Sequence, residues 1–221
     1  MTLLRSYGIR IDLHVHTRRY SACAESLNPE QLPERMARSG LDGVVIAEHD
    51  HLWPEEEIDR LNQRLEKGRI YRGVEVSSCN GHFVVIGLQT MDGISPGIGI
   101  SALVQRVRQQ GAAIIWAHPQ LCYSNTPAPC SLAELPRDID AVEVFSGVTE
   151  GLHASQARAM AQSNGWSQVA GSDAHILEHV GSVVTLFECL PKNEMQLARA
   201  IREGCCTTLQ ASGTGDSGRW P

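Results

Sequence analysis

The sequence predicts a single α/β domain that closes into a barrel rather than spreading as an open sheet. Short apolar runs rich in Val and Ile alternate with helix-like segments along most of the 221 residues, which is the pattern of strands covered on both faces. The chain, at 24.1 kDa, is large enough for one sizeable core. No G-x-G-x-x-G or P-loop follows any strand, which removes the usual nucleotide-binding open sheets. Strand–helix alternation of this kind favours a parallel α/β barrel.

The expected strands and helices follow one another with turn residues between them. The strands are expected at 9–15, 43–47, 70–76, 82–87, 112–117, 141–145, 168–171 and 183–186. The helices are expected at 29–39, 54–66, 100–110, 153–163 and 194–202, each with apolar residues at helical spacing. Glycines 40, 68, 111 and 204 follow four of these helices as candidate C-caps. Residues 211–221 are rich in Gly and Ser, so we expect a domain over 1–210 and a disordered tail after it.

Composition limits the cellular environment and the binding partners that we expect for the protein. No run of 18 apolar residues and no signal peptide is visible, so we expect a cytoplasmic protein without a membrane partner. The seven cysteines form no C-x-x-C pair, as in a protein with reduced thiols. The net charge of −6 and the lack of a Lys/Arg block make a nucleic-acid partner less expected than a small molecule. The sequence contains no indication of oligomeric state.

The stretch Asp12-Leu13-His14-Val15-His16-Thr17 ends the first strand and carries the first candidate ligands. Side chains alternate along a strand, so His14 and His16 point to the same side and can bind one metal ion. Asp12 is expected on that face too, where it would accept an N–H from a ligand histidine. The alternative is a pair of hydrogen-bonded core histidines. Further potential ligands along the chain argue against it.

Polar side chains interrupt the apolar runs where the strands of a barrel carry function, at their carboxyl ends. Six of the nine histidines lie at such places. The donors are His14, His16, Glu48, His49, Glu75, His82, His118, Glu143, Asp173 and His175. Nitrogen and oxygen donors converging on one barrel mouth are what a site for several metal ions requires. Glu75 is suited to bridge two ions because a carboxylate has two oxygens.

Five motifs resemble the polymerase and histidinol phosphatase (PHP) superfamily of metal-dependent phosphoesterases. They are DLHVHT at 12–17, GLDGVVIAEHD at 40–50, GVEV at 73–76, AHP at 117–119 and GSDAH at 171–175. The resemblance implies a distorted seven-stranded (β/α)7 TIM-like barrel that holds two or three ions of manganese, zinc or iron. It implies as metal ligands His14, His16, His49, Glu75, His118, Asp173 and His175, with His82 as a further one. Glu75, Asp173 and His175 are expected at the catalytic centre, with Glu143 behind the ligands.

Two positions depart from the family pattern. Cys23 stands where the family commonly has Asp or His, and it is either a thiolate ligand for zinc or iron or a small residue in a two-ion site. The usual T-D-H reads Ala47-Glu48-His49, so Glu48 is expected behind the ligand His49 with a side chain one methylene longer.

The function implied by this resemblance is hydrolysis of a phosphomonoester or phosphodiester of a small molecule or nucleotide by a metal-activated water. Arg18 and Arg19 follow His16 and are expected to contact the substrate phosphate, the alternative being a solvated loop. An amidohydrolase-type enzyme is a rival, but that family usually bridges its metals with a carboxylated lysine at a strand end. Neither Lys67 nor Lys192 has that position. A non-catalytic metal-binding module is the other alternative, and Cys23 and Glu48 are the features in its favour.

Overall fold

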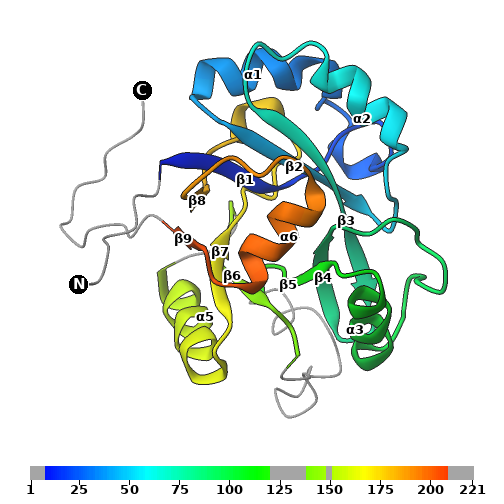
Figure 1. Cartoon of the computed structure of the whole chain (residues 1–221), viewed down its shortest axis with the longest axis vertical. Helices are drawn as coiled ribbons and strands as arrows, with labels where there is room; N and C mark the ends of the chain where they lie inside the picture. Colours follow the sequence, from blue (N-terminus) through cyan, green and yellow to red (C-terminus); the bar gives the residue numbers. More distant parts are fainter. Residues whose placement is uncertain (1–7, 120–137, 148–150, 209–221) are drawn as a thin grey trace.

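The fold is an α/β barrel-like sheet surrounded by helices (Figure 1), seen in a computed structural model that describes residues 8–119, 138–147 and 151–208. The strands in these residues are β1 Ile9–Val15, β2 Gly43–His49, β3 Arg69–Ser78, β4 Gly81–Ile86, β5 Ala113–Trp116, β6 Ala141–Phe145, β7 Ser167–Ala170, β8 Thr185–Phe187 and β9 Cys206–Thr208. The helices are α1 Leu32–Ser39, α2 Glu55–Asn62, α3 Ile100–Gln109, α5 Gly151–Asn164 and α6 Glu194–Arg202, with short 3-10 turns at Ala22–Ala24, Pro29–Gln31 and Leu177–His179. The expected tail, 211–221, lies outside the described residues.

The expectation of seven parallel strands is only partly right, because the described residues form nine strands in the order β7-β6-β5-β4-β3-β2-β1-β8-β9. Strands β1 to β3 are parallel, as are β5 to β7, but β4 is antiparallel to both of its neighbours. Only Cys79 and Asn80 connect β3 to β4, and so short a link makes a hairpin rather than a crossover. Strands β8 and β9 add a further antiparallel extension beside β1.

Backbone and side-chain hydrogen bonds join the two ends of the sheet. The segment after β7 forms a parallel bridge to β1 between Ala174 and Val15. Asp12 accepts the backbone N–H groups of Ser172 and Gly181, each at 2.8 Å. At the last residue of β7, the Thr185 hydroxyl of β8 bonds both the N–H and the carbonyl of Ala170, each at 2.8 Å. The sheet is therefore nearly closed.

An inner core fills the barrel, and two outer cores pack between strands and helices. The inner core takes alternate residues of the strands, among them Ile11, Val45, Tyr71 and Val84, as expected for a closed sheet. Leu197, Ala198 and Ile201 of α6 belong to it as well, and α6 lies in front of the centre of the strands in Figure 1. One outer core lies under α1 and α2, and the other lies under α3 and α5.

Local contacts explain where the helices end. Helix α1 stops at Gly40, which is left-handed with φ 62°. Helix α2 ends at Asn62, four residues earlier than expected, because the Asn62 amide bonds both the carbonyl and the N–H of Ile70 on β3, at 2.9 and 2.8 Å. The described part of the chain contains no helix with the length and apolarity needed to cross a membrane.

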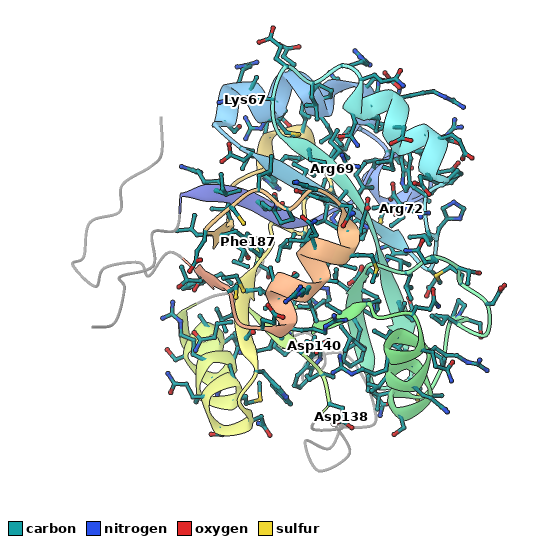
Figure 2. The ribbon with its side chains drawn as sticks, viewed as in Figure 1. Lys67, Arg69, Arg72, Asp138, Asp140 and Phe187 are labelled. Atoms are coloured by element: carbon teal, nitrogen blue, oxygen red, sulfur yellow. The ribbon has the colours of Figure 1, made fainter. Side chains whose placement is uncertain are left out.

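Two residues labelled in Figure 2 show how the base of the barrel is held. Asp140 opens β6, accepts the N–H of Ile114 at 2.8 Å and pairs with Arg108 of α3 at 2.8 Å. Phe187 of β8 is buried in the inner core. The apolar floor and these ties leave the carboxyl ends of the strands as the place for polar side chains.

Replacing Asp12 by Asn tests the closure of the sheet. The amide nitrogen would face an N–H donor, so one buried hydrogen bond is lost and one donor is left unpaired, which costs about 1–3 kcal/mol. We expect that loss in the free energy of unfolding measured in urea. Asp59→Asn, on the exposed face of α2, is the matched control. Equal stabilities of the two variants would show that the sheet does not depend on Asp12.

Candidate metal centre

A β-bulge at the end of β1 sets the direction of the first two histidines. Three steps along β1, from Asp12 to Val15, pair with two steps along β2. Ile11 and Leu13 accordingly lie in the inner core while Val15 packs in an outer one. An extra residue reverses the alternation of side chains. His14 and His16 therefore reach the barrel mouth.

The same bulge corrects the expectation for Asp12, which does not share the face of His14. Its carboxylate accepts backbone N–H groups, including that of His14 at 3.3 Å, rather than a ring N–H. Burial raises the pKa of Asp12 to about 6, and hydrogen bonds from Ser172, Gly181 and His14 limit the rise. The carboxyl group is thus ionised at neutral pH and holds the strand rather than a ligand ring.

The next donors come from strands whose lower residues form the inner core. His49, Glu75 and Glu143 each lie an even number of residues beyond an inner-core position of β2, β3 or β6, so they face inward. His82 lies at the start of β4. Because β4 runs antiparallel to β3 and β5, its start meets their ends. His82, at the start of its strand, therefore lies beside donors at the ends of the neighbouring strands.

Glu75 lies at the centre of the site, fully buried between five imidazoles from four segments. Its Oε1 is 2.8 Å from His118 Nε2 and 3.1 Å from His82 Nδ1. Its Oε2 is 2.9 Å from His49 Nδ1, 3.3 Å from His16 Nε2 and 3.5 Å from His14 Nε2. Burial favours the neutral acid, but these histidines outweigh burial and lower the pKa of Glu75 well below its usual value. The carboxylate is ionised, with nitrogen donors facing both oxygens.

The segment after β7 brings a second carboxylate. Asp173 Oδ1 lies 3.2 Å from His16 Nε2 and 3.6 Å from His14 Nε2. Burial opposes ionisation of Asp173, but His14 and His16 outweigh it and lower its pKa to about 2. His175 Nδ1 donates to the carbonyl of Asp173 at 2.9 Å. The ring centroid of His175 is 4.4 Å from that of His16.

The backbone is strained around these donors. Among the described residues, three that are not glycine have positive φ: Asp50 at 51°, His118 at 26° and Asp173 at 53°. Such conformations cost about 1–3 kcal/mol each and collect at functional sites. All three follow a strand end at the barrel mouth. The rest of the fold must therefore offset the backbone strain that positions His118 and Asp173.

Glu143 orients two ligand candidates from behind. Its Oε1 lies 3.0 Å from His14 Nδ1, and its Oε2 accepts the backbone N–H of His118 at 2.9 Å. With Nδ1 donating to a carboxylate, the Nε2 lone pair of a neutral His14 faces the centre. This is how carboxylates commonly fix the tautomer of metal-binding histidines.

Glu48 holds the first loop rather than reaching into the centre. It accepts hydrogen bonds from the Thr17 backbone at 3.1 Å, the Thr17 and Ser21 hydroxyls, and Trp53 Nε1 at 3.0 Å. Ser21 Oγ also contacts His16 Nδ1 at 3.4 Å and accepts the His49 N–H at 3.3 Å. Sequence reasoning missed Ser21, because a serine in a polar loop has no distinguishing pattern.

The remaining candidates lie outside the cluster of donors. Cys23 is exposed in the turn Ala22–Ala24, and no group of potential ligands among the described residues includes it. Arg19 pairs with Glu57 at 3.1 Å, while Arg18 lines a cavity beside the site. The structure thus places both arginines at the mouth without bringing them among the donors.

The donors fit more than one metal ion. Four overlapping sets of three residues hold one donor atom each within 4.8 Å of one another: His16, His49 and His175; His14, His16 and Glu75; His14, His118 and Asp173; Glu75, His82 and His118. Glu75 Oε2 is buried without a hydrogen-bond partner in the described structure, although three imidazole nitrogens lie within 3.5 Å. A cation between these atoms satisfies all of them, and such donors suit zinc, manganese and iron.

Comparison with known proteins agrees with the motifs and this geometry. A family model described as PHP-associated matches residues 151–206, which include β7, Asp173 and His175. Over these residues the chain is similar to the PHP superfamily. An uncharacterized protein of Methanocaldococcus jannaschii is 29% identical over 184 residues, covering 81% of this chain and 70% of the relative.

Two solved structures share the fold of this chain. A two-domain protein from Bacteroides vulgatus, described as containing a predicted PHP-like metal-dependent phosphoesterase, has a TM-score of 0.65 at 16% identity; the match covers 90% of this chain and 64% of that one. An amidohydrolase from Chromobacterium violaceum, solved with bound sulfate and no metal, has a TM-score of 0.58 at 18% identity, covering 77% of this chain and 89% of that one. At these identities the likeness establishes the fold.

Gly171→Ala tests how tightly the donors are packed. An added Cβ would lie 2.5 Å from the Cβ of His14 and 3.0 Å from Glu143 Oε1. We expect a loss of about 1–3 kcal/mol of stability from overpacking, together with less bound metal by elemental analysis. Gly99→Ala, where nothing lies within 4 Å, is the control. Full metal content in Gly171→Ala would contradict the close packing of His14.

Metal binding should release protons. Burial favours neutral rings, but the neighbouring carboxylates outweigh it and raise the pKa of His14, His16 and His118 in the metal-free protein. A ligand imidazole must be neutral, so metal affinity should rise with pH and binding at pH 7 should release protons. Calorimetry of manganese binding in two buffers of different ionisation enthalpy counts them. Binding without proton release would contradict these pKa directions.

Proposed function

We propose that the protein is a metal-dependent hydrolase of phosphoester bonds in a small phosphorylated molecule. The observation that carries this proposal is the buried Glu75 carboxylate, whose two oxygens each face imidazole nitrogens from different strands. That arrangement suits a carboxylate bridge between two cations. Two or three divalent ions, of manganese, zinc or iron, are proposed for the four overlapping donor sets.

The ions, when bound, supply positive charge for the phosphoryl oxygens and make water a nucleophile at neutral pH. The chain's own groups prepare that chemistry. Glu143 orients the His14 ring, and Glu48 fixes the loop that carries His16 through Thr17 and Ser21. We assign metal ligation to His14, His16, His49, Glu75, His82, His118, Asp173 and His175. Cys23 is not needed in this set, since the nitrogen and oxygen donors alone form each group.

Asp173 and His175 belong, with His49 and His82, to the part of the centre that is open to solvent. Their side chains are 11% and 32% exposed, whereas His14, His16 and Glu75 are at 0%. Burial lowers the pKa of His175, so its ring is largely neutral at pH 7 and can accept a proton or bind an ion. These two residues, with Glu75, are proposed to act directly at the reacting phosphate.

An amidohydrolase-type reaction is the rival that the comparison with the Chromobacterium violaceum enzyme supports. Lys67 and Lys192 are both exposed and lie outside the donor cluster. The bridging position belongs to Glu75 instead. The phosphoester reaction is therefore preferred, and parallel assays of an aryl phosphate, an aryl phosphodiester and an aryl amide distinguish the two.

His14→Ala and Asp173→Ala test the proposed function. Removing a ligand takes away several kcal/mol of charge stabilisation, so we expect turnover of phenyl phosphate or diphenyl phosphate with manganese to fall at least about 100-fold. Bound metal should fall in parallel by elemental analysis. His153→Ala, exposed on α5, is the control. Bound metal without phosphoester turnover in the parent protein would favour the non-catalytic metal-binding module, and undiminished turnover in either variant would refute the assignment.

A further inference from the structure

A cavity of about 430 Å³ lies between the loop after β1 and helix α2. It is lined by residues of both, together with Trp53 from the loop after β2. The residues that matter here are Arg18, Arg19, Pro29, Trp53, Glu57 and Arg60. None of them belongs to the groups of potential metal ligands.

The acidic groups of this cavity already have partners. Glu57 accepts from Arg19 Nε at 3.1 Å and from the Tyr20 hydroxyl at 3.0 Å. Glu30 pairs with Arg64. Because both carboxylates already have partners, they neutralise the other arginines of the cavity only in part.

Two guanidinium groups remain available. Arg18 and Arg60 are exposed and form no ion pair or side-chain hydrogen bond within the described residues. Arg60 acts on Glu57 only at longer range, where it helps to lower the pKa of that carboxyl group against the effect of burial. Free guanidinium groups bind carboxylate or phosphate oxygens in pairs. The cavity therefore carries unpaired positive charge that favours binding of an anion.

One wall of the cavity is apolar and rigid. Trp53 and Leu61 are each 2% exposed, and Pro29 is buried. The Trp53 indole is held by its hydrogen bond to Glu48, and the Trp53 carbonyl accepts from Arg72 of β3, labelled in Figure 2. A fixed apolar wall beside two free cations suits an organic anion rather than a hydrated inorganic ion.

The cavity is within reach of the metal centre. Arg18 follows the ligand candidate His16 by two residues, which is at most about 7 Å of backbone. Trp53 and the Thr17 and Ser21 side chains all bind the same Glu48 carboxylate. One small molecule can therefore occupy the centre and the cavity together.

We propose that this cavity recognises a second anionic group on the substrate, with Arg18 and Arg60 as the residues that determine specificity. The inference rests on the proposed function and narrows it: the substrate is a small organic phosphoester whose non-reacting part carries a carboxylate or a further phosphate next to an apolar body. The reacting phosphate goes to the metal centre and the second anion to the guanidinium pair.

Direct binding tests the cavity without any turnover. Benzoate and phenylphosphonate serve as anionic probes and benzamide as the neutral one, followed by calorimetry and by tryptophan fluorescence. We expect both anions to bind more tightly than benzamide, and Arg18→Ala/Arg60→Ala to weaken them about tenfold, as expected for lost charge-assisted hydrogen bonds. Arg38→Ala, on α1 outside the cavity, should bind as the parent does. Binding that survives in the double variant but disappears in His14→Ala would place the anions at the metal centre and overturn the proposal.

Kinetics then test the role in specificity. The ratio of kcat/KM for 4-carboxyphenyl phosphate to that for phenyl phosphate should fall about tenfold in Arg60→Ala and stay constant in Arg38→Ala. Arg60→Lys should recover part of it, since charge remains but the paired geometry is lost. An unchanged ratio would refute anion recognition by the cavity but would leave the proposed phosphoesterase activity untouched. Arginine-dependent anion binding in a protein without phosphoester turnover would refute the proposed function and support the cavity.

Discussion

A buried carboxylate surrounded by imidazoles is the constraint on which this structure depends. Glu75 has no exposure, and five histidine side chains place a nitrogen within 3.5 Å of it. An unpaired charge in such a place is very costly, and even a paired one recovers its lost hydration only with good geometry. Protons shared among the histidines, or metal ions between them, are the two ways of balancing the site. The four overlapping donor groups, each able to hold a metal ion, favour metal ions as the balance.

The barrel is distorted in ways that deliver these donors. The bulge in β1 turns His14 and His16 toward the mouth, and the reversal of β4 brings His82 to the same end. Gly171 leaves room where any Cβ would meet the Cβ of His14. The bonds from Asp12 to Ser172 and Gly181 hold the segment that carries Asp173 and His175 against β1. Irregular backbone is thus concentrated at the mouth, while the inner core and α6 keep the other end regular.

Local patterns predicted much of the fold, since the strands at 9–15 and 141–145 and the helix at 194–202 appear where expected. Strand direction is not a local property, so the antiparallel β4 was not predicted. Strand β9 is three residues long and polar, too short for periodicity to show. Alternation also failed for Asp12, because a bulge depends on the partner strand. The donors at strand ends do come together, because each strand's carboxyl end was recognisable and barrels gather those ends. Ser21 and Arg60 needed the structure, since Glu48, which Ser21 binds, and Arg18, which lines the same cavity as Arg60, are distant in sequence.

The charge distribution reconciles a chain of net charge −6 with the anionic substrate proposed for it. Screening limits the reach of surface charges to about 8–10 Å in physiological salt, so the charges lining the approach matter more than the total. Near the centre, Glu75, Glu143 and Asp173 are engaged with histidines, while Glu57 and Glu30 are engaged with arginines. The proposed phosphoester would therefore meet the two free guanidinium groups and any ions held by the donors. Pairing within the protein removes the negative charge from the site without reducing the acidity of the rest of the surface, which favours solubility. In this proposal, specificity depends on which anion fits between the Trp53 indole and the two arginines, which belong to the loop after β1 and to α2 rather than to the barrel itself.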